Sequence, residues 1–279
     1  MNSLKQFFIS AYVTYCVVVT GFGVMSLSNG GDFSIWLAVS VATALPVIYF
    51  AWLYLSSVPR TSPGLVGVTG GIFMVTMYSV YTSYNSGVAS PLPLLALFSL
   101  VGWATYVGWY SHLGDRNEAK LKVGKKLPKM ELENYAGDKV SSEDWKEESS
   151  LILFYRGNWC PICTAQVQEL IEYEDRFEGL GVKMRFVSPQ SHKKSESFAK
   201  RTGMKADFLV DPKNSVAEKL GILHKGGLPF GFQVLGYDSD VPKPTIIITD
   251  SAGKIKFLDL TENYRLRPTP GDLLTAIQS

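Results

Sequence analysis

Full charges are nearly absent from the first 111 residues of this 279-residue chain. Between Gln6 and Ser111 only Asp32 and Arg60 are charged, whereas charges of both signs are dense from Leu113 onward. The formal net charge is only +2. No basic stripe with interleaved aromatic residues occurs, which argues against nucleic acid as a partner. The chain therefore divides into an apolar first part and a charged second part.

The apolar first part contains four long hydrophobic stretches. They cover residues 6–27, 33–55, 65–84 and 92–110, and turn-forming residues separate them. Each is close to the ~20 residues that a helix needs to cross a bilayer. A cleaved signal peptide is the alternative for the first stretch, but Lys5 alone provides its charged start and no convincing cleavage site follows. We therefore predict that residues 1–112 form an all-α bundle of four transmembrane helices, with the lipid bilayer as a partner.

Basic residues fall on one side of the membrane if all four stretches cross it. That side carries Lys5, Arg60 and the residues Arg116, Lys120, Lys122, Lys125 and Lys126, whereas the other side carries only Asp32. Lys and Arg are enriched in cytoplasmic loops. We expect a multi-pass protein whose amino terminus and second part are both cytoplasmic.

Cysteine is scarce, with three residues in the chain. Cys16 lies in the first apolar stretch and is interpreted as a small buried side chain. Cys160 and Cys163 form a C-x-x-C pair. A zinc site would need two further ligands, and His192 and His224 have no ligand-like spacing, so they are interpreted as surface or linker residues. No Gly-rich phosphate loop follows a strand, so we expect neither a metal nor a bound cofactor.

The second part alternates between strand and helix patterns. The run 151–155 is wholly apolar, as in a buried strand, and a helical pattern runs from Pro161 to about Gly179. Further strands are expected at 182–187, 206–210, 245–249 and 254–258, and further helices at 191–202, 214–220 and 270–277. This order indicates an α/β fold with a central mixed sheet flanked by helices. We predict a domain over 130–279, joined to the membrane region by a basic linker over 113–129.

The two neighbouring cysteines lie where the strand 151–155 gives way to the following helix. Unpaired N–H groups and the positive end of the helix dipole stabilise a thiolate at such a position. The two-residue spacing also brings the sulfur atoms close enough for a disulfide. Pro161 is tolerated between them because the first turn of a helix needs no N–H there. The sequence thus predicts a redox-active dithiol formed by Cys160 and Cys163.

The sequence around the dithiol resembles two related families. Trp159-Cys160-Pro161-Ile162-Cys163 resembles the W-C-x-x-C site of thioredoxin-fold proteins. The stretch from Phe154 to Gln166 is similar to the peroxiredoxin stretch F-Y-P-x-x-x-T-P-x-C-T-x-E. Tyr264-Arg265-Leu266-Arg267-Pro268 and other segments extend the likeness over about 123–278. This part of the chain resembles the peroxiredoxin-like branch of the alkyl hydroperoxide reductase/thiol-specific antioxidant (AhpC/TSA) family, which implies a thioredoxin-like fold.

The resemblance also implies roles for single residues. Cys163 falls on the peroxidatic cysteine and Cys160 on the preceding threonine. Pro244 and Thr245 begin a segment similar to the thioredoxin strand that a cis-proline precedes, so a cis bond at Pro244 is expected beside the thiols. Trp159 is expected to shield the disulfide.

The chain departs from the peroxiredoxin pattern at several positions. Arg156 stands in place of a proline and Gln166 in place of a glutamate, and the family's late arginine has only Lys243 nearby. Arg156 is either a solvated residue at the strand end or a charge that lowers a thiol pKa.

Three functions fit these observations. In the first, Cys163 attacks a peroxide, Cys160 closes the disulfide, and a thioredoxin-type or small-thiol reductant reopens it. In the second, Cys160 is the more exposed thiol and attacks a protein disulfide, as in a thiol–disulfide oxidoreductase. In the third, the dithiol is a non-enzymatic membrane redox sensor. We favour the first, because the family resemblance runs the length of the domain.

Overall fold

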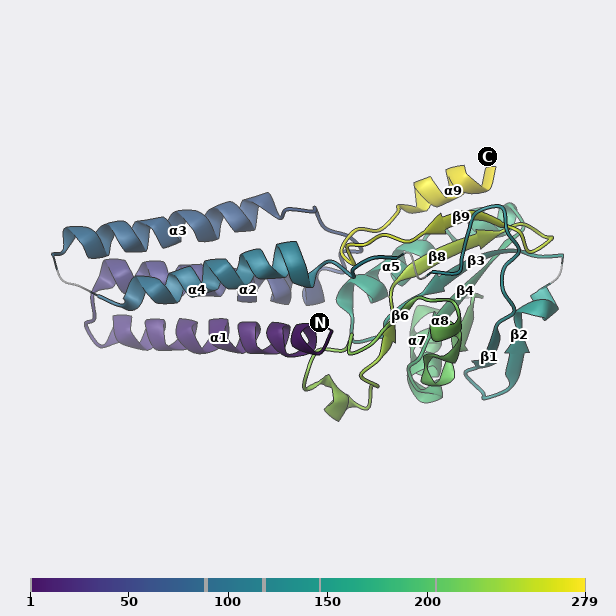
Figure 1. The fold of residues 1–279 in the computed structure, drawn as a ribbon, viewed down its shortest axis with the longest axis horizontal. Coiled ribbons are helices and arrows are strands. Elements are labelled where there is room, and N and C mark those ends of the chain that lie inside the picture. The colour runs from purple at the N-terminus through teal and green to yellow at the C-terminus, as the bar shows by residue number, and fades with distance from the viewer. Residues whose placement is uncertain (1, 88–89, 117–118, 146, 204, 279) are drawn as a thin grey trace. The chain divides into compact units, whose positions relative to one another are not determined.

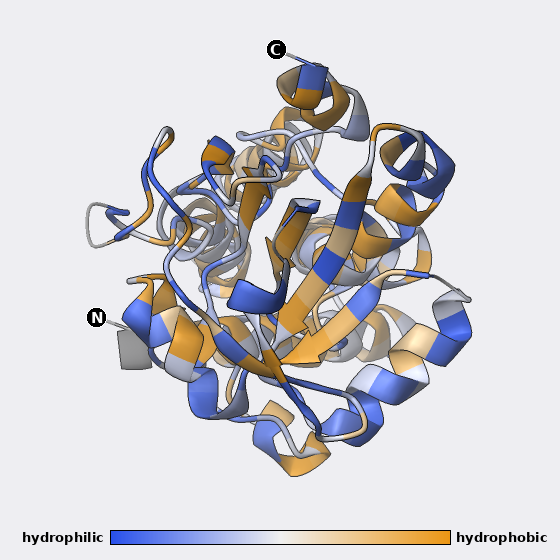
Figure 2. Ribbon diagram, turned by 90° about the vertical axis from the view of Figure 1, so that its right-hand side faces the viewer, coloured by the Kyte–Doolittle hydropathy of each residue, from blue (hydrophilic) through white to orange (hydrophobic). Residues whose placement is uncertain are grey.

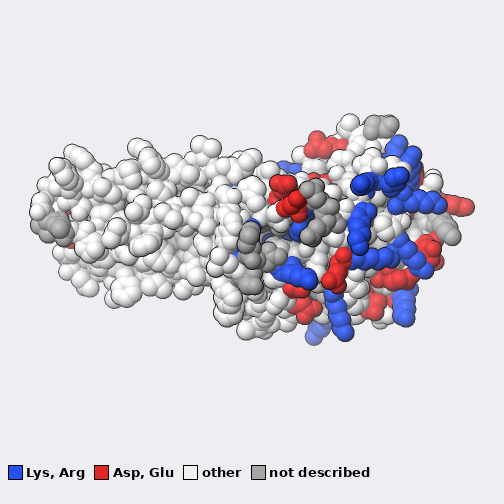
Figure 3. All heavy atoms as spheres, in the orientation of Figure 1, with Lys and Arg blue, Asp and Glu red and all other residues white. Residues whose placement is uncertain are grey.

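The computed structural model describes residues 2–87, 90–116, 119–145, 147–203 and 205–278. The chain forms two compact units. We call the first, Leu4–Ser56 with Thr61–His112, the helical unit. We call the second, which consists mainly of the chain from Leu113 onward, the α/β unit. Figure 3 shows that the charged side chains gather on the α/β unit, while the surface of the helical unit is almost free of them.

The helical unit contains four long helices. They are α1 (Asn2–Ser28), α2 (Phe33–Leu55), α3 (Val66–Asn85) and α4 (Leu92–Thr105), and α4 continues as a π-helical turn over Tyr106–Tyr110. Small and β-branched side chains, including Val39, Ala42 and Ala96, form the hydrophobic core between these helices. Small side chains of this kind let helix backbones approach each other closely.

Three of the described helices are long and apolar enough to cross a membrane. They span Leu4–Ser28, Phe33–Leu55 and Leu92–Tyr110. Helix α3, which we predicted as a further crossing, is 20 residues long but is not in this group. Its glycine, serine, threonine and tyrosine residues make it less apolar than the other helices. Four crossings and a cytoplasmic orientation therefore stay predictions.

The α/β unit is built on a mixed sheet with the strand order β2-β1-β5-β4-β3-β8-β9. The strands are β1 (Glu131–Asn134), β2 (Lys139–Ser141), β3 (Ser149–Phe154), β4 (Val182–Ser188), β5 (Asp207–Val210), β8 (Thr245–Thr249) and β9 (Ile255–Asp259). The central strands β3, β4 and β5 are parallel, and the other neighbours pair antiparallel. A small separate ladder pairs β6 (Leu223–His224) with β7 (Val241–Pro242).

Helices flank the sheet (Figure 1). They are α5 (Pro161–Ile171), α6 (Glu174–Gly179), α7 (His192–Thr202), α8 (Ser215–Lys219) and α9 (Pro270–Gln278). The core lies on the central strands, because residues 151–154 of β3 and all of β8 are apolar or β-branched and are buried on both faces. Figure 2 shows this concentration of hydrophobic residues along the central strands. The predicted mixed sheet flanked by helices is confirmed.

Some local predictions were wrong. The helix expected from Pro161 to Gly179 is two helices, because the backbone leaves the helical region at Tyr173 (φ −109°, ψ 9°). The segment predicted as a basic linker packs on the α/β unit, since Leu121 belongs to the hydrophobic core and the Leu127 N–H donates to the Gly253 carbonyl at 2.8 Å. His224, expected at the surface, is buried on β6.

Candidate active site

The two neighbouring thiols lie at the carboxyl end of β3, at the start of helix α5. Cys160 is the residue before the helix, with an extended backbone (φ −93°, ψ 108°), and Pro161 is the first helical residue. The Thr164 N–H donates to the Cys160 carbonyl at 3.0 Å, which closes the first turn. The predicted position of the dithiol at a helix start is therefore observed.

Both thiols are buried and reduced. The exposed fraction is 2% for Cys160 and 1% for Cys163, and neither sulfur forms a disulfide. Cys160 is the more exposed thiol only by this small margin, because both side chains are almost wholly buried. Both residues are thus almost wholly removed from solvent at the carboxyl end of β3.

The pKa values of the two thiols move in opposite directions. Burial by itself would raise the pKa of Cys163. The hydrogen bond from the Cys160 thiol, the charge of Arg267, and the backbone N–H and charge of Arg156 outweigh it and lower that pKa to about 6. Burial and the negative sulfur of Cys163 raise the pKa of Cys160. Of the two thiols, Cys163 is therefore the one that ionises first.

Arg156 links the thiols to the loop that follows β6. Its guanidinium donates to the Gly227 carbonyl and lies 4.7 Å from the centre of the Trp159 ring and 5.4 Å from that of Tyr264. The side chain is buried. Of the two interpretations left open for Arg156, burial excludes the solvated one, and its charge lowers the pKa of both thiols.

Trp159 immediately precedes the dithiol and contacts residues on both sides of it in sequence. Its indole N–H donates to the Arg156 carbonyl at 3.2 Å, and its ring meets Phe232 edge-on at 5.8 Å. The turn before it needs Gly157, whose φ of +134° lies in the region that favours glycine, and a Cβ there would come within 3.0 Å of the indole ring. Asn158 is held by the Gln190 side chain, which accepts from its N–H at 2.9 Å.

Pro244 and Thr245 lie at the same end of the sheet as the thiols. Strand β8 runs antiparallel to β3, and Thr245 pairs with Phe154. The prediction of a cis peptide bond at Pro244 was wrong, because the described residues include no cis peptide bond. Trans is the more stable form of an X–Pro bond. The Arg116 guanidinium donates to the Thr245 hydroxyl at 2.6 Å and to the Pro244 carbonyl at 3.3 Å.

Arg267 and Gln166 belong to motifs named from the sequence, but no role in the site was predicted for either of them. Arg267 is buried, and within the described chain its Nε and Nη2 atoms have no hydrogen-bond partner. Gln166, three residues after Cys163 on α5, is also buried, and its amide nitrogen likewise lacks a partner there. The signal for Arg267 was present in the motif Tyr264-Arg265-Leu266-Arg267-Pro268. Its approach to Cys163 depends on how the chain after β9 returns across the sheet.

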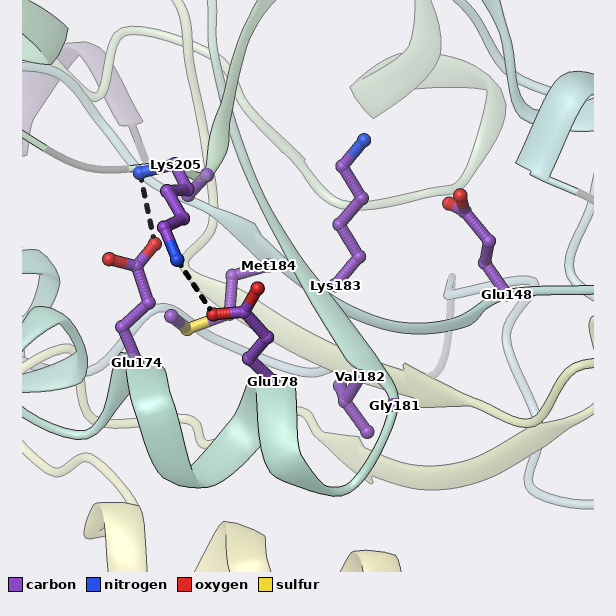
Figure 4. Close-up of a pocket in the computed structure, with 9 residues that line it drawn as sticks. Glu148, Glu174, Glu178, Gly181, Val182, Lys183, Met184 and Lys205 are labelled. Carbon is purple, nitrogen blue, oxygen red and sulfur yellow. Dashed lines mark hydrogen bonds and ion pairs between the residues drawn. The ribbon is translucent and has the colours of Figure 1, made fainter.

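A charged pocket of about 260 Å³ lies at the opposite end of the sheet from the thiols. Its lining includes Glu148, Glu174, Glu178, Lys183 and Lys205. Figure 4 shows Lys205 between the two α6 carboxylates, to which it binds through Nζ (3.0 Å to Glu178) and its backbone N–H (3.1 Å to Glu174). No cysteine lines this pocket, and its ionic groups are paired.

The mixed sheet and its flanking helices define a thioredoxin-like domain, with the two buried thiols at the start of α5. Residues 123–258 match the model of the AhpC/TSA family. This part of the chain is therefore an AhpC/TSA-family domain, as its sequence resemblance predicted.

Individual relatives are peroxiredoxins by name. The putative peroxiredoxin bcp of Haemophilus influenzae is 31% identical over 102 residues, which cover 37% of this chain and 66% of the relative. Peroxiredoxin Bcp of Bacillus subtilis is 26% identical over 137 residues, which cover 48% of this chain and 82% of the relative. The chain thus spans just under two thirds of the length of the first of these relatives.

A solved structure confirms the thioredoxin-like α/β fold. The crystal structure of reduced Prx3 from Vibrio vulnificus in complex with hydrogen peroxide superposes with a TM-score of 0.50 at 16% identity. It covers 56% of this chain and 99% of the Vibrio protein. The match lends no information on the helical unit.

Proposed function

We propose that this chain is a membrane-anchored thiol peroxidase of the peroxiredoxin-like type, an oxidoreductase that reduces peroxides through Cys160 and Cys163. The observation that carries the proposal is the buried Cys160–Cys163 pair at the start of α5, where the Cys160 thiol and the charges of Arg267 and Arg156 lower the pKa of Cys163. At neutral pH Cys163 is largely a thiolate, whereas Cys160 keeps its proton. A thiolate, not a thiol, is the nucleophile toward a peroxide.

The first step forms a sulfenic acid. The Cys163 thiolate attacks one peroxide oxygen, a sulfur–oxygen bond forms, and the O–O bond breaks. The second oxygen leaves as water or an alcohol after it takes up a proton, and Cys163 is left as sulfenic acid. The cysteine sulfur is oxidised by two electrons and the peroxide is reduced by two.

The second step closes the disulfide. The Cys160 sulfur attacks the Cys163 sulfur, and the hydroxyl of the sulfenic acid leaves as water with the proton of the Cys160 thiol. A thioredoxin-type or small-thiol reductant then supplies two electrons and two protons and restores the dithiol. The position of Cys160 just before the helix supports this role, because its thiol donates a hydrogen bond to the Cys163 sulfur.

Buried N–H donors support the step in which the O–O bond breaks. Negative charge grows on the leaving oxygen there, and preorganised donors in a water-poor site stabilise such charge strongly. Arg267 and Gln166 hold buried nitrogen atoms without partners among the described residues. Arg156 keeps a second positive charge beside the sulfur. These groups are the ones that we propose to bind the peroxide oxygens, with Trp159, Pro161, Pro244 and Thr245 as supporting residues.

We further propose that residues 1–112 are the membrane anchor, that residues 130–279 are the redox domain, and that this domain is cytoplasmic. The positions of the basic residues support the orientation. In the cytoplasm a disulfide is reopened by the reducing pool, so the cycle can turn over. The lipid bilayer is then a partner of the whole chain.

The decisive test compares three forms of the full chain in lipid nanodiscs: the parent, Cys160→Ser and Cys163→Ser. One equivalent of hydrogen peroxide is added, sulfenic acid is trapped within seconds, and mass spectrometry locates the adduct. We expect trapping on Cys163 in the Cys160→Ser form and a 160–163 disulfide in the parent. Cys16, present in all three forms, serves as an internal unreactive control.

Two other results would each favour one of the alternative functions. If neither form reacts with peroxide, while the reduced parent opens a model protein disulfide through Cys160, the protein is a thiol–disulfide oxidoreductase. Sluggish reaction in both assays would leave the sensor interpretation.

A further inference from the structure

An apolar loop follows the β6 strand and contacts the cover of the dithiol. We call residues 226–236 the apolar loop; it carries no charged side chain. It contains the short helical turn Phe232–Leu235 and is the green segment between β6 and β8 in Figure 1. Phe232 meets Trp159 edge-on, and the Gly227 carbonyl accepts from Arg156. The loop is therefore fixed to the active site at its base and at one ring.

Three large hydrophobic side chains at the tip of this loop are more than half exposed to solvent. Val234 is 87% exposed, Leu235 57% and Phe230 54%. Among the described residues of the α/β unit, these are three of the six large apolar side chains that are exposed, and the others are Val123, Tyr135 and Leu180. A cluster of this kind on a soluble surface marks a site of contact with a partner or a membrane.

The backbone of the apolar loop is bonded within itself. The N–H groups of Phe232, Val234 and Gly236 donate to carbonyls three residues earlier, at 3.2, 3.3 and 2.9 Å. The Gly231 N–H donates to the Gln233 side chain at 2.9 Å. Lys194 donates to the Leu235 and Gly236 carbonyls at 2.8 and 3.2 Å. Because unpaired backbone groups are costly in an apolar medium, this pairing suits a loop that enters lipid.

Tethering favours lipid as the occupant. Lys225 and Lys194 lie beside the apolar loop, and Asp238 and Asp240 follow it, so the charges around the loop are of both signs. An apolar tip flanked by charged residues suits the boundary between headgroups and acyl chains. Three helices of the same chain are apolar enough to cross a membrane, so a bilayer is always within reach of this unit.

We propose that the apolar loop is a lipid-docking surface, whose tip at Phe230, Val234 and Leu235 enters the acyl boundary of the bilayer that holds the helical unit. The occupant is lipid rather than a protein, because the same chain carries helices apolar enough to cross a membrane and the loop presents apolar side chains without a charge. Since the loop is fixed to Trp159 and Arg156, docking sets the carboxyl end of β3 at the membrane surface. The docking rests on the proposed membrane anchor, but it does not depend on the proposed peroxidase chemistry.

The test places the photoreactive residue p-benzoylphenylalanine in the full chain, in nanodiscs of phosphatidylcholine and phosphatidylglycerol. The test position is Val234. The matched negative control is Val123, an apolar residue of the same unit that is 61% exposed. The positive control is Val18, which is exposed on α1 within a membrane-crossing helix. After illumination, lipid adducts are counted by intact-mass and peptide mass spectrometry.

We expect lipid adducts at position 234 at least tenfold above those at position 123, and comparable with those at position 18. Adducts at 234 no more frequent than at 123, while 18 is labelled, would overturn the proposal. A crosslinked dimer in place of lipid adducts at 234 would also overturn it and identify a second copy of the chain as the occupant. Leu235 is a second test position, so a defect peculiar to the Val234 variant would not decide the outcome. The readout requires no turnover and is independent of whether peroxide is the substrate.

Discussion

Replacing Arg267 with glutamine should raise the pKa of Cys163. Burial opposes ionisation of this thiol, and the Cys160 hydrogen bond together with the charges of Arg267 and Arg156 lowers its pKa to about 6. An opposite charge within ~4–6 Å lowers a pKa by roughly 1–3 units. Because Arg267 shares the effect with two other residues, we expect its loss to raise the pKa by about one unit, which corresponds to ~1.4 kcal/mol.

The change has two separable consequences for the rate. At pH 7 the thiolate fraction of Cys163 should fall from roughly nine tenths to about one half, so ionisation alone slows the reaction with hydrogen peroxide about twofold. At pH 9 the thiol is ionised in both forms and this contribution vanishes. A rate deficit that persists at pH 9 would measure how much the Arg267 charge stabilises the leaving oxygen, for which a loss of ~10²-fold is typical of one preorganised donor.

The assay combines a thiolate absorbance titration with stopped-flow peroxide consumption across pH 5 to 9, an interval that brackets the pKa of about 6. Arg176→Gln is the matched control, because Arg176 is an exposed arginine on α6 whose guanidinium lies over the Tyr173 ring. The reasoning is refuted if Arg267→Gln titrates within about 0.3 units of the parent, well inside the shift expected from a lost neighbouring charge, and retains the parent rate at every pH.

Further predictions concern the scaffold that holds the site. Gly157→Ala should lower stability by about 1–3 kcal/mol, because φ is +134° and the new Cβ would meet the Trp159 ring at 3.0 Å; thermal melting should show no comparable loss for Gly179→Ala, whose Cβ meets nothing within 4 Å. Asp211→Ala should cost about 1–3 kcal/mol, since this carboxylate accepts the first N–H groups of α8 at 2.9 and 2.8 Å. Asp211→Asn should recover part of the loss, and the exposed Asp238→Ala should be neutral; equal melting temperatures for all three would contradict the capping role.

Much of the active-site framework could be predicted from the sequence because it is local. A wholly apolar run such as the one in β3 has to be a buried strand, and Cys160 and Cys163 directly follow it at a helix start. The hairpin of β8 and β9 follows from the turn at Asp250 and Gly253, whose N–H donates to the Asp250 carbonyl at 2.9 Å. In these cases the residues that decide the structure lie within a few positions of each other.

Predictions failed where distant segments meet. The basic residues of 113–129 suggested a solvated linker, yet Leu121 is part of the core because strand β9 and the end of α8 offer it apolar neighbours. His224 is buried because β6 pairs with β7. The sequence near His224 contains no pattern that predicts this pairing. The expected cis bond at Pro244 came from family resemblance alone, and in this chain the bond is trans.

The sequence by itself determined that this protein has an uncharged helical part and an α/β domain with a dithiol at a helix start. Hydrophobic periodicity and the chemistry of cysteine are properties of neighbouring residues, so they can be read along the chain. Only the tertiary structure decided which thiol ionises. That choice depends on the hydrogen bond between the two thiols and on the charge of Arg267, which lies about a hundred residues away in sequence and lowers the pKa of Cys163. Electrostatic interactions act through space, and only the folded chain fixes those distances.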